Sequence, residues 1–159
     1  MSKDEIKDEK GAAVKFPPPL VFLLMMLAAY GFHNFFPMTL DVLPFRFYLG
    51  ISMVTFGAVI IIISFFTFRH AKTRIEPWKP TSNIISTGIF SYSRNPIYLA
   101  FCFISLGIGV SLNSFWISLS FIPSIVVVFF IAIKKEELYL TNKFGDDYLE
   151  YKAKVRRWF

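Results

Sequence analysis

The fold is decided by residues 96–133, PIYLAFCFISLGIGVSLNSFWISLSFIPSIVVVFFIAI, which lie between Arg94 and the adjacent pair Glu136 and Glu137. This stretch consists of two apolar segments joined by a short polar break at residues 111–114. Apolar segments of this kind are typical of membrane-crossing helices. Since the chain crosses the bilayer and returns, we expect the arginine and the two carboxylates to face each other at one membrane surface. Ionisable groups at membrane depth are costly and usually functional, so the hairpin predicts a site.

The composition of the whole chain also indicates a membrane protein. Of its 159 residues, 55% are hydrophobic and 20 are phenylalanine, and the mean hydropathy is +0.52. Soluble domains rarely exceed about half apolar residues. We expect one integral-membrane domain over residues 1–159, with a polar N-terminal tail at 1–16. Cys102 is the single cysteine and lies inside an apolar run. One cysteine cannot form a disulfide framework.

Apolar runs predict four membrane-spanning helices. They cover residues 17–36, 45–68, 96–110 and 115–133. The third is shorter than the roughly 20 residues of a typical span. Pro123 predicts a kink in the fourth helix, and Gly107 and Gly109 predict close helix packing on the third. The predicted fold class is an all-α polytopic membrane protein with about four transmembrane helices and a cytoplasmic, amphipathic C-terminal helix.

Basic residues set the predicted orientation. Residues 69–94 carry five lysines and arginines against one acid, and residues 134–157 carry seven, whereas the other two loops hold few charges. By the positive-inside rule, both termini and the middle loop are cytoplasmic in an inner or plasma membrane. The bilayer is therefore an expected partner. The basic residues flank the spans and form no stripe, so nucleic-acid binding is not expected.

The tail is predicted to continue as helix beyond the membrane. Gly145 separates residues 134–142 from a second segment in which Asp146 begins the helix and Tyr148 and Tyr151 recur at helical spacing. Two interpretations remain open and are compatible. The segment is an amphipathic helix that lies at the interface, or it is a lid over the site.

The chemistry of the hairpin indicates an anion-binding pocket. Asn95 suits the cap before a helix that starts at Pro96, so free backbone N–H groups and Arg94 would together attract an anion. Tyr98 lies one turn into that helix, and the two glutamates add negative charge opposite. Such a pocket suits a zwitterion that also carries hydroxyl groups. The alternative is that Arg94 reaches lipid phosphates and that the glutamates pair with the lysines that precede them.

Three motifs resemble a known family. They are TGIFSYSRNPIYL at residues 87–99, EEL at 136–138, and FGDDYLEYK at 144–152 followed by Val155. In order and spacing they are similar to the signature of the isoprenylcysteine carboxyl methyltransferase and phospholipid methyltransferase superfamily. The resemblance covers residues 79–157, the motif-bearing half of the chain. Residues 156–159, RRWF, depart from the Val-Pro sequence with which many members continue.

The resemblance implies an integral-membrane methyltransferase that uses S-adenosylmethionine as its cofactor, and no metal. Asn95 stands where many members have histidine, which weakens a role as a base. The implied cofactor-binding residues are Ser82, Asn83, Ile84, Ile85, Phe90, Asn95, Pro96, Ile97, Tyr98 and Glu136. The candidate catalytic residues are Arg94, Tyr98 and Glu137.

The methyl acceptor remains open at this point. A carboxylate acceptor, such as an isoprenylcysteine, needs no base, whereas an amine or a thiol needs one, and Glu136, Glu137 and Tyr98 are the candidates. We expect a lipophilic or small acceptor at the cytoplasmic membrane surface, and oligomeric state is left open. The alternative from another class is a non-catalytic membrane scaffold or assembly factor that retains the fold.

Overall fold

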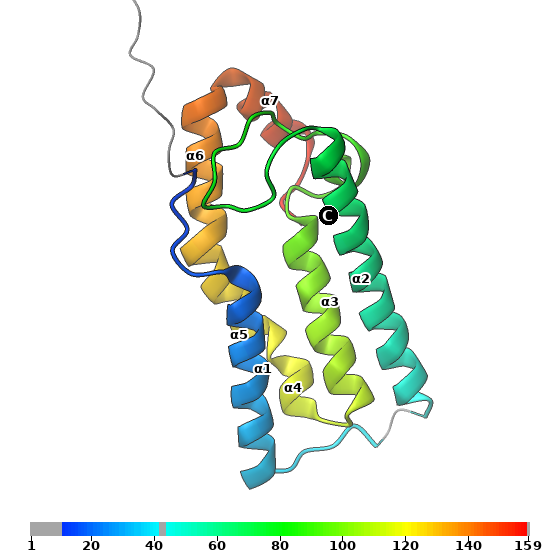
Figure 1. The fold of residues 1–159 in the computed structure, drawn as a ribbon. Coiled ribbons are helices and arrows are strands. Elements are labelled where there is room, and N and C mark those ends of the chain that lie inside the picture. The colour runs from blue at the N-terminus through cyan, green and yellow to red at the C-terminus, as the bar shows by residue number, and fades with distance from the viewer. Residues whose placement is uncertain (1–10, 42–43, 159) are drawn as a thin grey trace, which may run out of the picture.

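The computed structural model describes residues 11–41 and 44–158, which form helices and loops without strands (Figure 1). The elements are α1 (Pro18–Phe35), α2 (Arg46–His70), the 3₁₀ turn η1 (Gly88–Ser91), α3 (Pro96–Ser111), α4 (Phe115–Leu119), α5 (Phe121–Val128), the π-helical turn η2 (Phe129–Ile133), α6 (Lys134–Phe144) and α7 (Asp146–Lys154). The all-α prediction is confirmed.

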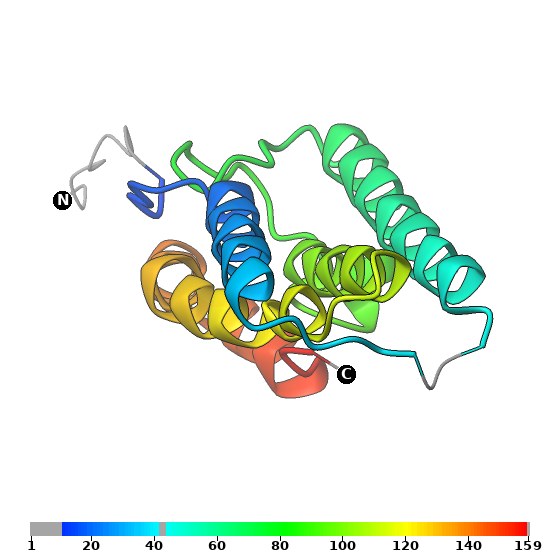
Figure 2. The ribbon, with the colours of Figure 1, turned by 90° about the horizontal axis from the view of Figure 1, so that it is seen from below.

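Long apolar helices run side by side along one axis. In the described part of the chain, three helices are long and apolar enough to cross a membrane, namely α1, α2 and the run Phe115–Phe144. α3 is also apolar but has 16 residues, a length of about 24 Å. A helix satisfies its own backbone hydrogen bonds, which is why such segments are stable in lipid. Figure 2 shows α3 between α2 on one side and the α4–α5 segment on the other.

Glycines bring α2 and α3 close together. A Cβ added at Gly107 would lie 2.9 Å from the Met53 Cβ, and one at Gly57 would lie 2.7 Å from the Ala100 carbonyl oxygen. Real Cβ atoms do not approach neighbours so closely, so both positions require glycine. The predicted role of Gly107 in close helix packing is confirmed.

The fourth apolar segment is not one regular α-helix. α4 ends at Leu119 and α5 begins at Phe121, so the helix is interrupted one turn before Pro123, as that residue predicted. A π-helical turn follows at Phe129–Ile133 and was not predicted. Its extra residue changes which face of the following helix α6 points inward. α6 carries Glu136 and Glu137, so this turn helps to aim the two carboxylates.

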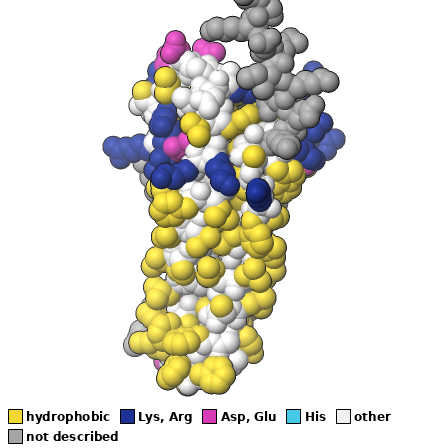
Figure 3. Space-filling model, turned by 90° about the vertical axis from the view of Figure 1, so that its left-hand side faces the viewer, with side chains coloured by type: hydrophobic (Ala, Val, Ile, Leu, Met, Phe, Trp, Pro, Cys, Tyr) yellow, Lys and Arg dark blue, Asp and Glu magenta, His cyan; other side chains and the backbone are white. Residues whose placement is uncertain are grey.

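Polar and basic residues gather at one end of the molecule. On the face drawn in Figure 3, lysine and arginine side chains gather at this end, and the body below it is mostly hydrophobic. α6, α7 and the long loop between α2 and α3 lie at this end, whereas the α1–α2 and α3–α4 connections lie at the other (Figure 1). The arrangement matches a helical body in lipid with one polar end in water.

The segment before α1 is built into the polar end. The Ala12 N–H donates to the Pro77 carbonyl oxygen at 3.0 Å, which ties this segment to the loop between α2 and α3. Ala12 and Val14 are buried in one apolar cluster with Phe22 and Tyr98. Part of the expected polar tail at 1–16 therefore packs in the core, and residues 1–10 of that expectation lie outside the described residues.

Candidate functional site

A cavity of about 340 Å³ lies at the polar end. It is enclosed by the starts of α1 and α3, by α6 and α7, and by the loop between α2 and α3. Among the residues singled out from the sequence, those that line it are Asn83, Ile84, Ile85, Phe90, Arg94, Asn95, Pro96, Ile97, Tyr98 and Glu136. Ser82 and Glu137 are not among the lining residues.

Tyr98 and Glu136 form a pair in the cavity wall. The Tyr98 hydroxyl on α3 donates to the Glu136 carboxylate on α6 at 2.5 Å, and Tyr98 is 8% exposed. Both side chains line the cavity. The two ends of the hydrophobic hairpin therefore meet, as its out-and-back path predicted. This hydrogen bond fixes the orientation of the Glu136 carboxylate.

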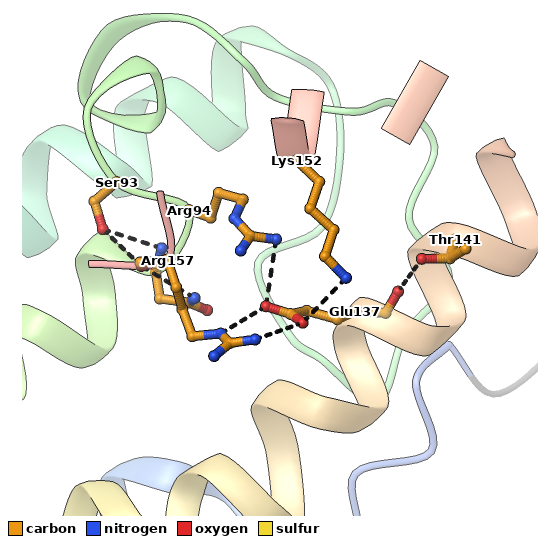
Figure 4. Close-up of polar contacts among 7 residues, drawn as sticks. Ser93, Arg94, Glu137, Thr141, Lys152 and Arg157 are labelled. Atoms are coloured by element: carbon orange, nitrogen blue, oxygen red, sulfur yellow. Dashed lines mark hydrogen bonds and ion pairs between the residues drawn. The ribbon is translucent and has the colours of Figure 1, made fainter. Parts of the chain in front are cut away.

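Glu137 faces a cluster of cations. Arg157 donates to both of its oxygens, from Nε at 2.9 Å and from Nη2 at 3.0 Å. Arg94 Nη1 lies 3.4 Å from one oxygen and Lys152 Nζ 3.7 Å from the other. Figure 4 shows the three side chains converging on this carboxylate from the α2–α3 loop, α7 and the tail.

These contacts do not match the alternative in which the glutamates pair with the lysines that precede them. Glu137 pairs with residues that are distant in sequence, and the neighbouring Lys134 lies over the rings of Phe129 and Phe130. The hydrogen bond with Glu137 raises the pKa of Arg157, so that guanidinium stays charged. Local pairing between adjacent residues on one helix does not describe this site.

Arg94 is a buried cation with unused donors. Its side chain is 9% exposed, which does not fit a residue that reaches out to lipid phosphates. Within the described residues its Nε and Nη1 have no hydrogen-bond partner, because the approach of Nη1 to Glu137 lacks hydrogen-bond geometry. Arg94 lines the cavity. Buried donors of a charged group are costly to leave unmet, so this guanidinium suits an anionic ligand.

Asn95 occupies the predicted cap position but does not cap α3 with its side chain. Its Nδ2 donates instead to the Arg157 carbonyl oxygen at 3.3 Å, and the Ser93 hydroxyl donates to the same oxygen at 3.1 Å. The capping prediction was wrong because the tail returns to this segment and offers an acceptor. The first N–H groups of α3, on Ile97 and Tyr98, belong to residues that line the cavity.

Aromatic residues form another part of the wall. Phe68 and Phe90 pack edge to face with their centroids 5.4 Å apart, and the Tyr151 hydroxyl donates to the Phe90 carbonyl oxygen at 2.7 Å. Burial raises the pKa of Tyr148 and of Tyr151, so both hydroxyls stay protonated. The two tyrosines come from α7 and line the cavity, which supports the lid interpretation of this helix.

Several lining residues were missed in the sequence. They are Ala12, Pro18, Pro19, Ile61, Phe68, Arg74, Ile75, Glu76, Pro77, Trp78, Thr81, Phe101, Tyr139 and Leu140. Most belong to apolar runs or to the α2–α3 loop, where nothing in the residue types separates a cavity wall from a lipid-facing surface. The loop's Pro77-Trp78 pair, flanked by charges, was a local signal of a structured turn.

Comparisons with known proteins find methyltransferases that are similar in sequence. A family model described as phospholipid methyltransferase matches residues 45–147. The chain is 33% identical over 109 residues to the protein-S-isoprenylcysteine O-methyltransferase of Saccharomyces cerevisiae, covering 67% of this chain and 46% of that protein. It is 28% identical over 110 residues to the Homo sapiens protein of the same name, covering 67% and 38%. The chain thus spans less than half the length of these relatives.

A shorter bacterial protein is also similar. An uncharacterized protein of Haemophilus influenzae is 42% identical over 62 residues, which cover 39% of this chain and 98% of that protein.

Proposed function

The chain belongs to the phospholipid methyltransferase family, and on that premise we propose that it is a membrane-embedded methyltransferase. It moves a methyl group from S-adenosylmethionine to a lipophilic acceptor that carries a carboxylate, such as an isoprenylcysteine. The observation that carries the proposal is the buried Arg94 guanidinium, which lines the cavity with unused donors beside the Tyr98–Glu136 pair.

The chemistry of the cavity wall fits the cofactor. A volume of about 340 Å³ lies within the usual range for small-molecule sites. Glu136 would accept hydrogen bonds from the cofactor's ribose hydroxyls or ammonium group, and the segment Asn83 to Ile85 with Phe90 would hold the adenosine. The bound cofactor supplies a methyl group that its sulfonium already activates.

The chain's own residues then supply positioning. Arg94 would hold the acceptor carboxylate on one planar edge of its guanidinium, formed by Nη2 together with the unmet Nε or Nη1, which fixes the direction of approach. Tyr98 fixes the Glu136 carboxylate, and Tyr148 and Tyr151 exclude water from one side. In-line transfer depends on such positioning far more than on proton chemistry.

A carboxylate acceptor fits this site better than an amine or a thiol. The latter two must lose a proton before they react, whereas a carboxylate is already ionised and is matched by the buried Arg94 guanidinium. Three cations already neutralise Glu137, and Tyr98 donates to Glu136. We therefore assign Glu137 to the charge cluster that surrounds Arg94.

We further propose that the polar end faces the cytoplasm in an inner or plasma membrane. The cavity then opens where a polar cofactor arrives from water and a lipophilic acceptor from the bilayer. The basic side chains around this end, seen in Figure 3, support that orientation.

Cofactor binding tests the proposal in purified protein held in detergent. S-adenosylmethionine at about 100 times its dissociation constant should stabilise the protein by about 2.7 kcal/mol. Glu136→Gln should lose most of this stabilisation, and Glu150→Gln, which changes an exposed carboxylate on α7, should keep it. Transfer of labelled methyl to a prenylated cysteine should follow the same order. A wild-type protein that shows neither stabilisation nor transfer would favour the scaffold alternative.

A further inference from the structure

The tail after α7 lies directly against the segment that carries Arg94. We call residues 155–158 the C-terminal strap. The Arg94 N–H donates to the Arg156 carbonyl oxygen at 3.1 Å, and Ser93 and Asn95 both donate to the Arg157 carbonyl oxygen. These three hydrogen bonds fix the position of the strap backbone against the start of α3.

The side chain of Arg157 donates hydrogen bonds to both oxygens of the Glu137 carboxylate. Its Nε and Nη2 bind one oxygen each, and its guanidinium lies 5.0 Å from the centre of the Phe129 ring. Paired donors on a planar guanidinium match a carboxylate better than a single donor does. Arg157 is thus the principal partner of Glu137.

Arg94 competes for the same carboxylate and is left outside hydrogen-bonding geometry. Its Nη1 lies 3.4 Å from a Glu137 oxygen that already accepts from Arg157. Glu137 still supplies a nearby negative charge, which lowers the cost of burying the Arg94 guanidinium. The Nε and Nη1 donors remain available to a group in the cavity.

From this geometry we infer that Arg157 is a positioning residue, which occupies both oxygens of Glu137 and so keeps the Arg94 donors available to a carboxylate in the cavity. The inference rests on the proposed function for the identity of that carboxylate, which belongs either to the acceptor or to the amino-acid part of the cofactor. The strap lies where this chain departs from the Val-Pro sequence of many family members. We therefore assign this role of Arg157 to this chain and not to the family.

Replacing Arg157 tests the inference through binding. In Arg157→Gln, Glu137 is free to bind Arg94 with both oxygens and to withdraw its donors from the cavity. Affinity for the carboxylate ligand should fall about tenfold. If the carboxylate is the acceptor's, the acceptor KM rises while the dissociation constant of S-adenosylhomocysteine, measured by calorimetry, stays constant. If it is the cofactor's, that dissociation constant rises instead.

Three further variants separate positioning from a merely structural role. Arg156→Gln, whose side chain is exposed on the same strap, should behave as wild type. Arg157→Lys should recover affinity only in part, because an ammonium occupies one oxygen. Adding Glu137→Gln to Arg157→Gln removes the competitor for Arg94 and should restore affinity to within about threefold of wild type. A loss that this double variant does not recover would overturn the inference, as would unchanged affinity in Arg157→Gln.

A readout without any ligand keeps this inference separate from the proposed function. The coupling between Arg94 and Glu137 can be measured by a double-mutant cycle of unfolding in mixed detergent micelles. It should be larger in the Arg157→Gln background than in wild type, because the two residues pair fully only there. Equal coupling in both backgrounds would contradict the inference. If wild type neither binds the cofactor nor transfers methyl, the proposed function fails while this cycle still decides the role of Arg157.

Discussion

At the scale of single residues, the site depends on Arg94, a buried guanidinium whose Nε and Nη1 donors have no hydrogen-bond partner among the described residues. Burying a guanidinium with unmet donors is unfavourable, and the nearby Glu137 offsets only part of that cost. A bound anion would remove the remainder. The free protein therefore leaves charged donors unmet at the point where the proposed acceptor binds, which favours binding of an anion over that of a neutral or cationic molecule.

Substitution of Arg94 tests whether the site needs the planar two-donor geometry of a guanidinium or only its positive charge. We expect Arg94→Lys to impair methyl transfer nearly as much as Arg94→Ala, with a loss on the order of 100-fold, because an ammonium cannot hold a carboxylate in one direction. The measurement is turnover of a prenylated cysteine acceptor by both variants, with cofactor affinity determined in parallel. Near wild-type turnover in Arg94→Lys would show that only the charge of this residue matters.

The residue scale also shows where sequence reasoning was insufficient. The meeting of the arginine motif with the glutamate pair was predictable, because hydropathy alone gives the out-and-back path of the hairpin. The pairing of Glu137 with Arg157 was not, because it depends on how α7 and the strap fold back. Asn95 was misassigned for the same reason, since its amide binds a carbonyl that lies 62 positions further along the chain.

At the scale of elements, the packing of α2 on α3 sets the floor of the cavity. Phe68 and Ile61 from α2 and Phe101 from α3 all line it, so any change in the distance between the two helices changes its shape. The contact uses glycines, which allow the backbones to approach where lipid offers no hydrophobic drive for helix association. The stability of this pair and the shape of the site are therefore coupled.

A bulky residue at the α2–α3 contact should separate the helices. Gly107→Leu is expected to destabilise the protein by about 2 kcal/mol or more, because the new side chain overlaps Met53 and the backbone of α2. Gly31→Leu on α1 is the matched control, because a Cβ there meets no atom within 4 Å. Unfolding in mixed detergent micelles, followed by tryptophan fluorescence, measures both. Equal stability of the two variants would mean that the close contact is not needed.

The elements themselves were largely predictable from the sequence. The predicted spans at 45–68 and 96–110 correspond to Arg46–His70 and Pro96–Ser111, because proline and charged residues mark the ends of the apolar runs. The π-helical turn at Phe129–Ile133 was not predictable. All five of its residues are apolar, and hydropathy does not register one extra residue per turn.

At the scale of the whole molecule, charge and hydropathy agree on one orientation. The polar end carries the cavity, and the opposite end is closed by a small network in which the Asn113 side chain binds both the Leu40 N–H and the Asp41 carboxylate. On the face drawn in Figure 3 the lysine and arginine side chains gather at the first of these ends, whereas Arg46 begins α2 at the opposite end. If the polar end is cytoplasmic, the proposed methyl transfer takes place on the inner face of the membrane.

Cysteine accessibility tests that orientation. In a Cys102→Ala background, a cysteine placed at Lys154 near the polar end should resist a membrane-impermeant maleimide added to intact cells. A cysteine at Thr39, exposed at the opposite end, should react with it. Permeabilised cells, in which both positions become accessible, provide the control. The reverse pattern would place the cavity on the outer face.

The wall of the cavity joins segments from far apart in the chain, with Ala12 on one side and Tyr151 on another. Synthesis and membrane insertion proceed from the first of these residues toward the second. A nascent chain whose helices are already in the bilayer therefore has no binding site until α7 has left the ribosome and folded back. Incomplete translation products would occupy membrane without completing the proposed cofactor pocket.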